Sequence, residues 1–197
     1  VQKVAKQYQA SITEYLNAVL LYSLLQKQEH DFHLRLRPVR IAMPVNLRRF
    51  FPSKTLRNFI TMVYPSIDPR LGDYTFEEIV TQVHHYMRYY INSKFLRGDI
   101  TTNASTQRNP LIRIVPLFLK DFVVRQFYQR VQDKNSSAGL TNMGAIRVPD
   151  DMKPYLERFD IYMGIPYSQR TNCAIVSFED TLTVNFASCI IEADVER

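Results

Sequence analysis

The sequence is short of cysteine. Only Cys173 and Cys189 occur in its 197 residues, and they do not form a CxxC pair. A disulfide-rich secreted domain or a cysteine-based structural zinc site would need more thiols. There is also no secretory signal and no apolar run long enough to cross a bilayer. We therefore expect a soluble, cytoplasmic protein with reduced thiols and no metal site.

Several common motifs are missing as well. The chain has no P-loop, no dinucleotide-binding fingerprint, no internal repeat and no low-complexity tract. Its hydrophobic fraction of 46%, with 12 Tyr and 12 Phe, is ample for a globular core and excludes a disordered protein.

Positive charge is concentrated in one stretch. The net charge is +6, and the span from Arg35 to Arg57 holds seven basic residues and no acidic one (positions 35, 37, 40, 48, 49, 54 and 57). Such a cluster suits cofactor phosphates, nucleic acid or acidic residues elsewhere in a larger protein. A solvated basic face explains it equally well. We find no nucleic-acid-binding motif and do not expect nucleic acid as a partner.

Helix signals are clear at two capping boxes. Ser11 with Glu14 predicts a helix over residues 12–28, and Thr75 with Glu78 predicts a helix that stops at Gly98. An amphipathic helix is also expected over residues 116–131.

Strand patterns lie between these helices. We predict strands over residues 39–43, ended by Pro44, over 55–64, 139–149 and 160–165, and a hairpin over 173–186. Because strands and helices do not alternate strictly, the expected fold is α/β with a mixed α+β sheet.

Adjacent histidines, His84 and His85, lie in the second predicted helix. Neighbours on a helix point about 100° apart, so they do not converge on one metal ion. The nearby sequence offers no carboxylate to orient either imidazole. We therefore expect no catalytic role for them.

Polar residues interrupt an apolar strand pattern at residues 139–149. Thr141, Asn142 and Gly144 offer a hydroxyl, an amide and accessible backbone to a ligand that approaches the chain closely. A strand that enters a turn and satisfies these groups locally is the plainer interpretation. The residues alone leave both open.

Four stretches, in this order, resemble a known superfamily: residues 44–48 (PVNLR), 56–59 (LRNF), 141–144 (TNMG) and the hairpin 175–186. Together they resemble the C-terminal half of the alcohol acetyltransferase-like and wax ester synthase-like branches of the chloramphenicol acetyltransferase superfamily. That superfamily also includes carnitine acyltransferases and the condensation domains of nonribosomal peptide synthetases. The likeness covers residues 1 to about 191.

The resemblance implies one of two related halves of a CoA-dependent acyltransferase, with the substrate tunnel between them. The family's general base is the second His of His-His-x-x-x-Asp-Gly, in the N-terminal half. His84 and His85 do not match, because Tyr89 and Tyr90 stand at the Asp and Gly positions. We expect residues 1–197 to be a single C-terminal subdomain excised from a longer parent.

The site residues follow from the same resemblance. Thr141 matches the tunnel hydroxyl that donates to the oxyanion of the tetrahedral intermediate, and Asn142 is the amide beside it, although Gly144 follows sooner than in the family pattern. Asn46, Arg48 and Asn58 are expected to brace the interface between the halves. Arg48 and Arg49 are candidates for contacts to CoA.

Partners and alternatives complete the expectation. The parent would use acetyl-CoA or another acyl-CoA as co-substrate, with no tightly bound cofactor, and an alcohol or amine as acceptor. The isolated chain should be inactive and should self-associate through the face that meets the other half. A noncatalytic binding module on the same fold is the main alternative, and a basic nucleic-acid-binding domain is the weaker one.

Overall fold

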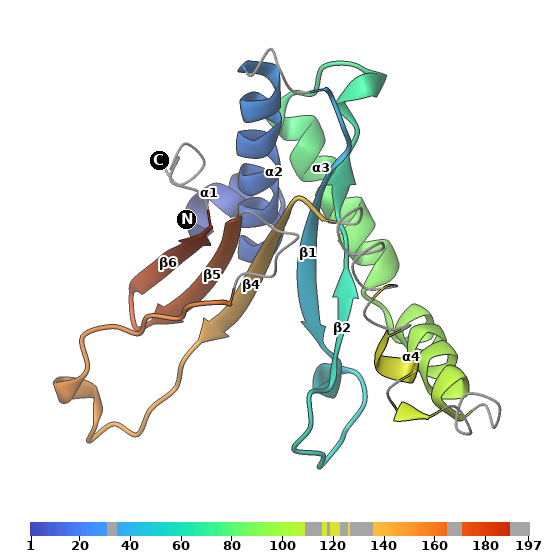
Figure 1. The fold of residues 1–197 in the computed structure, drawn as a ribbon. Helices are drawn as coiled ribbons and strands as arrows, with labels where there is room; N and C mark the ends of the chain where they lie inside the picture. The colour runs from blue at the N-terminus through green and yellow to red at the C-terminus, as the bar shows by residue number, and fades with distance from the viewer. Residues whose placement is uncertain are drawn as a thin grey trace.

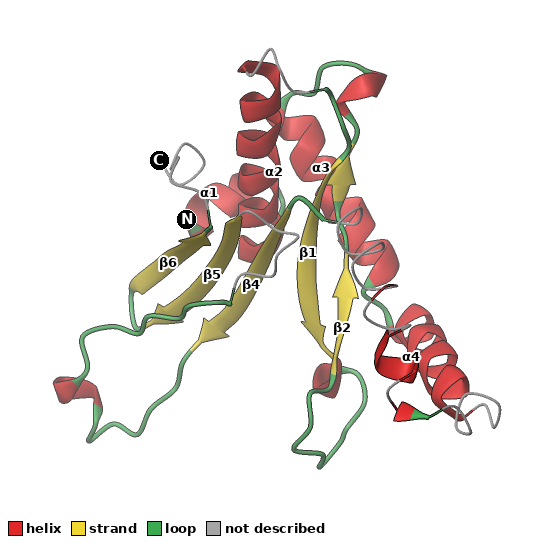
Figure 2. Ribbon diagram, viewed as in Figure 1, coloured by secondary structure: helices red, strands yellow, loops and turns green. Residues whose placement is uncertain are grey.

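The structure is a computed structural model that describes residues 1–30, 35–108, 116–117, 119–122, 126, 136–164 and 171–189. A mixed sheet carries helices on one face (Figures 1 and 2). This confirms the mixed α/β fold class. The described helices are α1 (Gln2–Gln7), α2 (Ile12–His30), α3 (Phe76–Tyr90) and α4 (Ser93–Arg108), with 3-10 turns η1 (Leu47–Arg49), η2 (Pro69–Leu71) and η3 (Lys153–Tyr155).

The six described strands follow the order β2-β1-β4-β5-β6, with the short β3 also paired to β1. Their bounds are β1 (Val39–Asn46), β2 (Ile60–Val63), β3 (Ser66–Ile67), β4 (Ala138–Ala145), β5 (Thr171–Phe178) and β6 (Thr181–Ser188). The central strands β1, β4 and β5 are parallel, and β2, β3 and β6 pair in antiparallel fashion. The predicted hairpin is therefore confirmed as β5 and β6.

Strands β1 and β4 pair over a short distance only. Ile41 pairs with Ala138 and Ala42 with Gly139, and beyond these residues the strands separate, as Figure 1 shows. We call this separation the strand split. Because both strands are parallel, their carboxyl ends flank it, which is where α/β proteins commonly place ligands.

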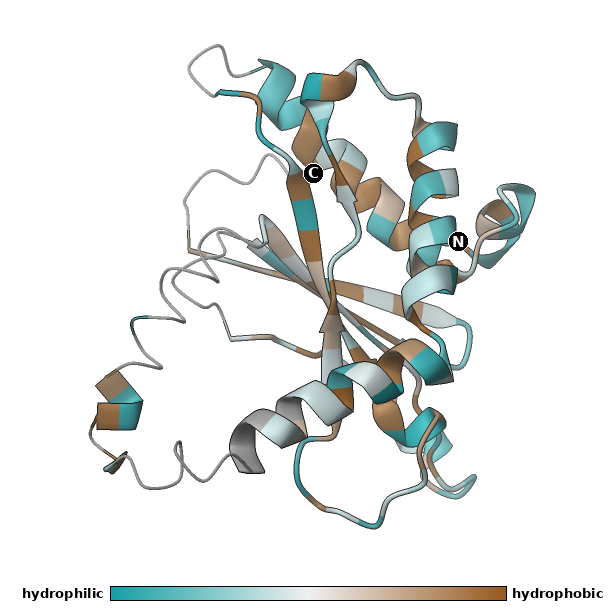
Figure 3. Cartoon of the chain, turned by 90° about the vertical axis from the view of Figure 1, so that its right-hand side faces the viewer, coloured by the Kyte–Doolittle hydropathy of each residue, from teal (hydrophilic) through white to brown (hydrophobic). Residues whose placement is uncertain are grey.

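The main core lies between the sheet and helices α2 and α3. Its fully buried members include residues from both helices and from the three parallel strands, such as Leu21, Ile41, Ile79, Leu140 and Ile175. In Figure 3 the hydrophobic colour is strongest along the strands at the centre of the view, whereas the helices mix hydrophobic and hydrophilic residues. This is the pattern of amphipathic helices on a sheet. Both predicted capping boxes are present at the starts of α2 and α3.

The prediction that Pro44 ends the first strand is wrong. Strand β1 continues to Asn46, and Pro44 pairs with Met62 of β2. The amides of Ile41 and Leu47 donate toward the β2 side, so the nitrogen of Pro44 points toward the strand split, where β4 has already left β1. The missing N–H therefore removes no ladder bond.

The second strand begins at Ile60 rather than at Thr55. Residues 50–59 form a loop instead, because the Arg48 guanidinium donates to the carbonyls of Thr55 and Arg57 and turns the chain back on itself. We call these residues the 50–59 loop.

The helix predicted to stop at Gly98 is two helices. Helix α3 ends at Tyr90, and Asn92 then caps α4 by accepting hydrogen bonds from the amides of Lys94 and Phe95. Asparagine is a strong helix-capping residue, and it overrides the expected continuation. Gly98 lies inside α4. The helix predicted over 116–131 lies mostly outside the described residues.

Residues 160–164 form no strand, contrary to prediction. They lie instead against the sheet face opposite the helices: Asn172 donates to the Gly164 carbonyl, and Asn185 donates to Asp160. The ring of Phe159 meets that of Phe178, with centroids 5.1 Å apart. This excursion therefore covers the β5 and β6 side of that face.

Candidate functional site

Thr141 lies on β4 just past the point where β4 leaves β1. It pairs with Ala174, and its side chain lies on the sheet face opposite α2, because strand side chains alternate and the next residue, Asn142, reaches α2. Thr141 is partly buried, and its hydroxyl makes no hydrogen bond to another described residue. The group is thus available to a ligand at the strand split.

Asn142 is fully engaged in local contacts. Its Nδ2 donates to Thr13 Oγ1 on α2 at 2.9 Å, and its Oδ1 accepts from the amide of Gly144 at 2.8 Å. Gly144 has φ of 77°, a left-handed conformation that suits glycine, within the bulge between Asn142 and Ala145. The structure therefore does not bring Thr141 and Asn142 together on one face. Asn142 instead ties the bulge to α2.

Helix α2 packs on one face of the sheet and contacts the strands on both sides of the split through two polar residues, Thr13 and Asn17. Thr13 contacts β4 through Asn142, and Asn17, one turn later, donates to Met43 Sδ of β1 at 3.3 Å and to the Thr13 carbonyl at 2.9 Å. Asn17 is completely buried, and its Oδ1 has no hydrogen-bond partner in the described part of the chain. The helix thus holds both arms of the sheet. Sequence reasoning missed this pair, whose only signal is polar spacing of i, i+4 in an apolar helix.

A carboxylate does lie beside one histidine, contrary to expectation. Glu14 Oε2 is 3.3 Å from His84 Nδ1 and also accepts from the Ser11 amide at 2.7 Å. Glu14 is only 5% exposed, whereas His84 is partly exposed, with the ring of His85 beside it. The carboxylate comes from α2, 70 residues away in sequence. The pair joins α2 to α3 on the helix side of the sheet, so it does not face Thr141.

The residues expected to brace an interface form a local brace. Asn46 Oδ1 accepts from the amide of Arg48 at 3.0 Å and caps η1. Arg48 Nη2 donates to the carbonyls of Thr55 at 3.0 Å and Arg57 at 2.8 Å. Arg48 is therefore committed to the 50–59 loop. Arg49 and Asn58 are exposed, and Arg49 makes no ion pair with a described acidic residue.

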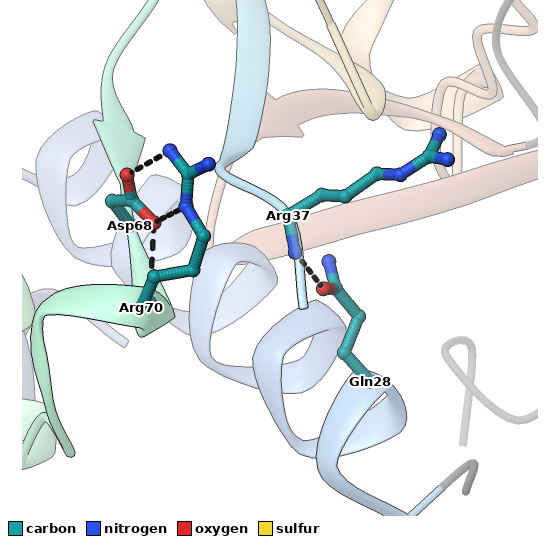
Figure 4. A network of polar contacts seen from close by, with 4 residues as sticks. All are labelled: Gln28, Arg37, Asp68 and Arg70. Atoms are coloured by element: carbon teal, nitrogen blue, oxygen red, sulfur yellow. Dashed lines mark hydrogen bonds and ion pairs between the residues drawn. The ribbon is translucent and has the colours of Figure 1, made fainter. Parts of the chain in front are cut away.

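The first acidic residue after the basic stretch, Asp68, is already paired. Asp68 binds Arg70 at 2.6 Å, and this hydrogen bond holds the Asp68 pKa below its usual value (Figure 4). In the same view, the Arg37 backbone amide donates to Gln28 at 3.0 Å, while its guanidinium extends away from the other labelled residues. Among the described acidic residues, Asp68 lies close enough to Arg40 for their charges to interact.

The buried thiol is not a nucleophile. Cys173 lies on β5 opposite Leu140, and burial raises its pKa to about 11. A thiol with that pKa stays protonated near neutral pH, and the reactive form of cysteine is the thiolate. Among the described residues, no group of three metal-ligating side chains could hold a metal ion.

Comparisons with known proteins identify the fold. No protein-family model matches the chain, and no curated protein sequence matches it. Among solved structures, the epimerization domain from the third module of tyrocidine synthetase B is similar, with a TM-score of 0.50 and 10% identity over 94% of this chain. The chain spans 38% of that domain's length. At this identity the similarity shows only a likeness of fold to that epimerization domain.

Proposed function

We propose that this chain is the C-terminal half of a two-half acyltransferase that moves an acyl group from CoA to an alcohol or amine. In this proposal it supplies one wall of the tunnel, and the other half supplies the general-base histidine. The observation that carries the proposal is the Thr141 hydroxyl, which has no hydrogen-bond partner among the described residues and stands where β1 and β4 separate. The condensation-domain-like fold supports it.

Thr141 would act on the developing charge. When the acceptor, deprotonated by the other half, attacks the thioester carbonyl, that oxygen becomes an oxyanion, and Thr141 Oγ donates a hydrogen bond to it. Collapse of the intermediate then releases the CoA thiolate. A preorganised donor of this kind is worth about 3 kcal/mol in the transition state. The contacts of Asn142 with Thr13 and Gly144 would hold Thr141 in position, which makes Asn142 a positioning residue.

The CoA donor carries phosphates that need a cation. The Arg48 guanidinium already donates to two carbonyls, whereas the neighbouring Arg49 is exposed and makes no such bonds to described residues. We therefore assign the phosphate contact to Arg49 and the bracing role to Arg48. The co-substrate is an acyl-CoA that binds reversibly, and its chain length depends on both halves.

The other half would cover the sheet face opposite the helices. On that face Met62 of β2 is 38% exposed and Met143 of β4 is 62% exposed, beside Pro44 and Thr141. Residues 159–164 do not cover the β2 and β4 part of this face, since their described contacts go to β5 and β6. Apolar side chains left exposed on a strand face are typical of an interface.

The test compares Thr141→Val with Thr141→Ser in the full-length protein. Valine keeps the shape and removes the hydroxyl, so kcat should fall about 100-fold with little change in KM, whereas serine should retain most of the activity. Steady-state release of CoA measures both. A Thr141→Val enzyme with unchanged kcat would remove Thr141 from the mechanism.

A noncatalytic binding module is the second candidate. One observation favours it. Glu14 and His84 form a carboxylate–imidazole pair, and this pair lies on the opposite side of the sheet from Thr141. Reading the upstream half decides between the two, because an intact His-His-x-x-x-Asp-Gly motif supports chemistry and a degraded one supports binding.

A further inference from the structure

The 50–59 loop projects beyond the ends of β1 and β2, away from α2 and α3 (Figure 1). Leu56 in this loop is fully exposed, and the exposed cations Lys54 and Arg57 lie on either side of it in the sequence. From these features we infer that the loop docks on an anionic lipid surface. The inference does not depend on the proposed acyl transfer.

Charge favours an anionic partner. No acidic residue occurs between Asp31 and Asp68, and Asp68 is paired with Arg70. Lys54 and Arg57 make no ion pair with any acidic residue in the described part of the chain. Both cations are therefore free to meet lipid phosphates or carboxylates, each strengthening binding to an anionic surface roughly fivefold.

The loop is shaped before it meets a partner. The two carbonyls that accept from Arg48 belong to Thr55 and Arg57, on either side of Leu56. Within the loop, the Ser53 hydroxyl accepts from the Thr55 amide and the Thr55 hydroxyl accepts from the Arg57 amide. Little ordering entropy is lost on docking, because these bonds already fix the apex.

The arrangement fits a bilayer surface better than a protein surface. A protein interface needs a contiguous apolar patch with a polar rim, on the order of 1,000 Å² in total. In the 50–59 loop Leu56 is the fully exposed apolar side chain, and it lies between two exposed cations, which suits insertion into the headgroup region. The contact would be peripheral, and no helix in the described residues is long and apolar enough to span a membrane.

The experiment is vesicle sedimentation with the purified 197-residue chain. We expect weak, salt-sensitive binding to phosphatidylcholine vesicles that contain about 30% phosphatidylserine, near 0.1 M salt, and none to pure phosphatidylcholine. Lys54→Gln with Arg57→Gln should weaken binding about 30-fold, and Leu56→Ser about tenfold. Leu56→Phe should retain it.

A matched control separates the loop from net charge. Lys3→Gln with Lys6→Gln, on exposed positions of α1, lowers the net charge by the same two units, from +6 to +4. This variant should bind nearly as well as the parent chain. All variants change exposed side chains, so circular dichroism should show an unchanged fold.

Four results would overturn the inference. They are absence of binding to anionic vesicles, equal binding to neutral ones, equal losses in the loop and α1 variants, and an unaffected Leu56→Ser variant. A lipid-independent dimer that Leu56→Ser dissociates would instead assign the loop to a second copy of the chain. Loss of acyl transfer by the Leu56→Ser variant of the full-length protein, with no vesicle binding by the parent chain, would assign the loop to a contact with the other half.

Discussion

Asn142 and Thr141 are neighbours with opposite surroundings. The amide of Asn142 is satisfied by Thr13 and Gly144, while the hydroxyl of Thr141 lies on the other face without a described partner. In a strand, adjacent side chains point to opposite faces, so one residue can secure the backbone while the other meets a ligand. The contacts of Asn142 confirm local satisfaction for that residue, whereas the role of Thr141 stays a prediction.

Removing the Asn142 amide should loosen this anchor. Asn142→Ala loses both hydrogen bonds and should lower the free energy of unfolding by about 2 kcal/mol. Asn142→Asp keeps the acceptor for Gly144, and the Thr13 hydroxyl can rotate to donate, so the loss should be smaller. Urea denaturation measures both. Equal losses for the two variants would contradict the assigned bonds.

Cys173 makes stability depend on alkaline pH. Burial raises its folded-state pKa from 9.0 to about 11, so the unfolded chain releases this proton first. The contribution is complete below about pH 9 and is lost as pH rises toward 11, by at most about 1.4 kcal/mol per pH unit. The difference in unfolding free energy between the parent chain and Cys173→Ala should therefore shrink over that range. A constant difference would argue against a buried thiol.

At the scale of elements, the chain is built around the strand split. Strand β1 tolerates Pro44 because its nitrogen faces the split, and α2 holds the two arms through Thr13 and Asn17. The buried Asn17 Oδ1 without a described partner costs stability, on the order of 1–3 kcal/mol for such a group. Polar side chains of α2 thus contact both strands that flank the split.

The 50–59 loop should depend on Arg48. Arg48→Lys cannot reproduce the guanidinium contacts to the Thr55 and Arg57 carbonyls, so amide hydrogen exchange in residues 50–59 should rise several-fold. Overall stability should fall by about 1 kcal/mol or less, because the loop is exposed. Arg49→Lys is the matched control and should leave exchange unchanged. Similar exchange in both variants would contradict the assigned role of Arg48 in holding the loop.

For the whole molecule, the uncovered sheet face is the dominant feature. If the chain is one half of a tunnel, the isolated chain should release no CoA from acetyl-CoA in the presence of an alcohol. Turnover by the isolated chain would mean that the active site is misplaced.

The same face should also associate with itself. Met62→Glu places a charge among exposed apolar residues and should shift the chain toward monomer in size-exclusion chromatography with light scattering. Tyr155→Glu, which changes an 88% exposed side chain on η3, is the control. Strictly monomeric behaviour of the parent chain at high concentration would count against an interface there.

Local signals were enough to predict the capping boxes at Ser11 and Thr75, the β5–β6 hairpin and the mixed α/β class, because each depends on residues close together in sequence. The end of β1, the Glu14–His84 pair and the Asn142–Thr13 bond could not be predicted, since each depends on which distant segment lies beside it. Pro44 fits in β1 because β4 has moved away there, and the face on which Thr141 lies is known only once Asn142 is seen to contact α2. Sequence patterns reflect periodicity and turn chemistry, whereas these features arise from the way in which helices and strands 70 or more residues apart pack together.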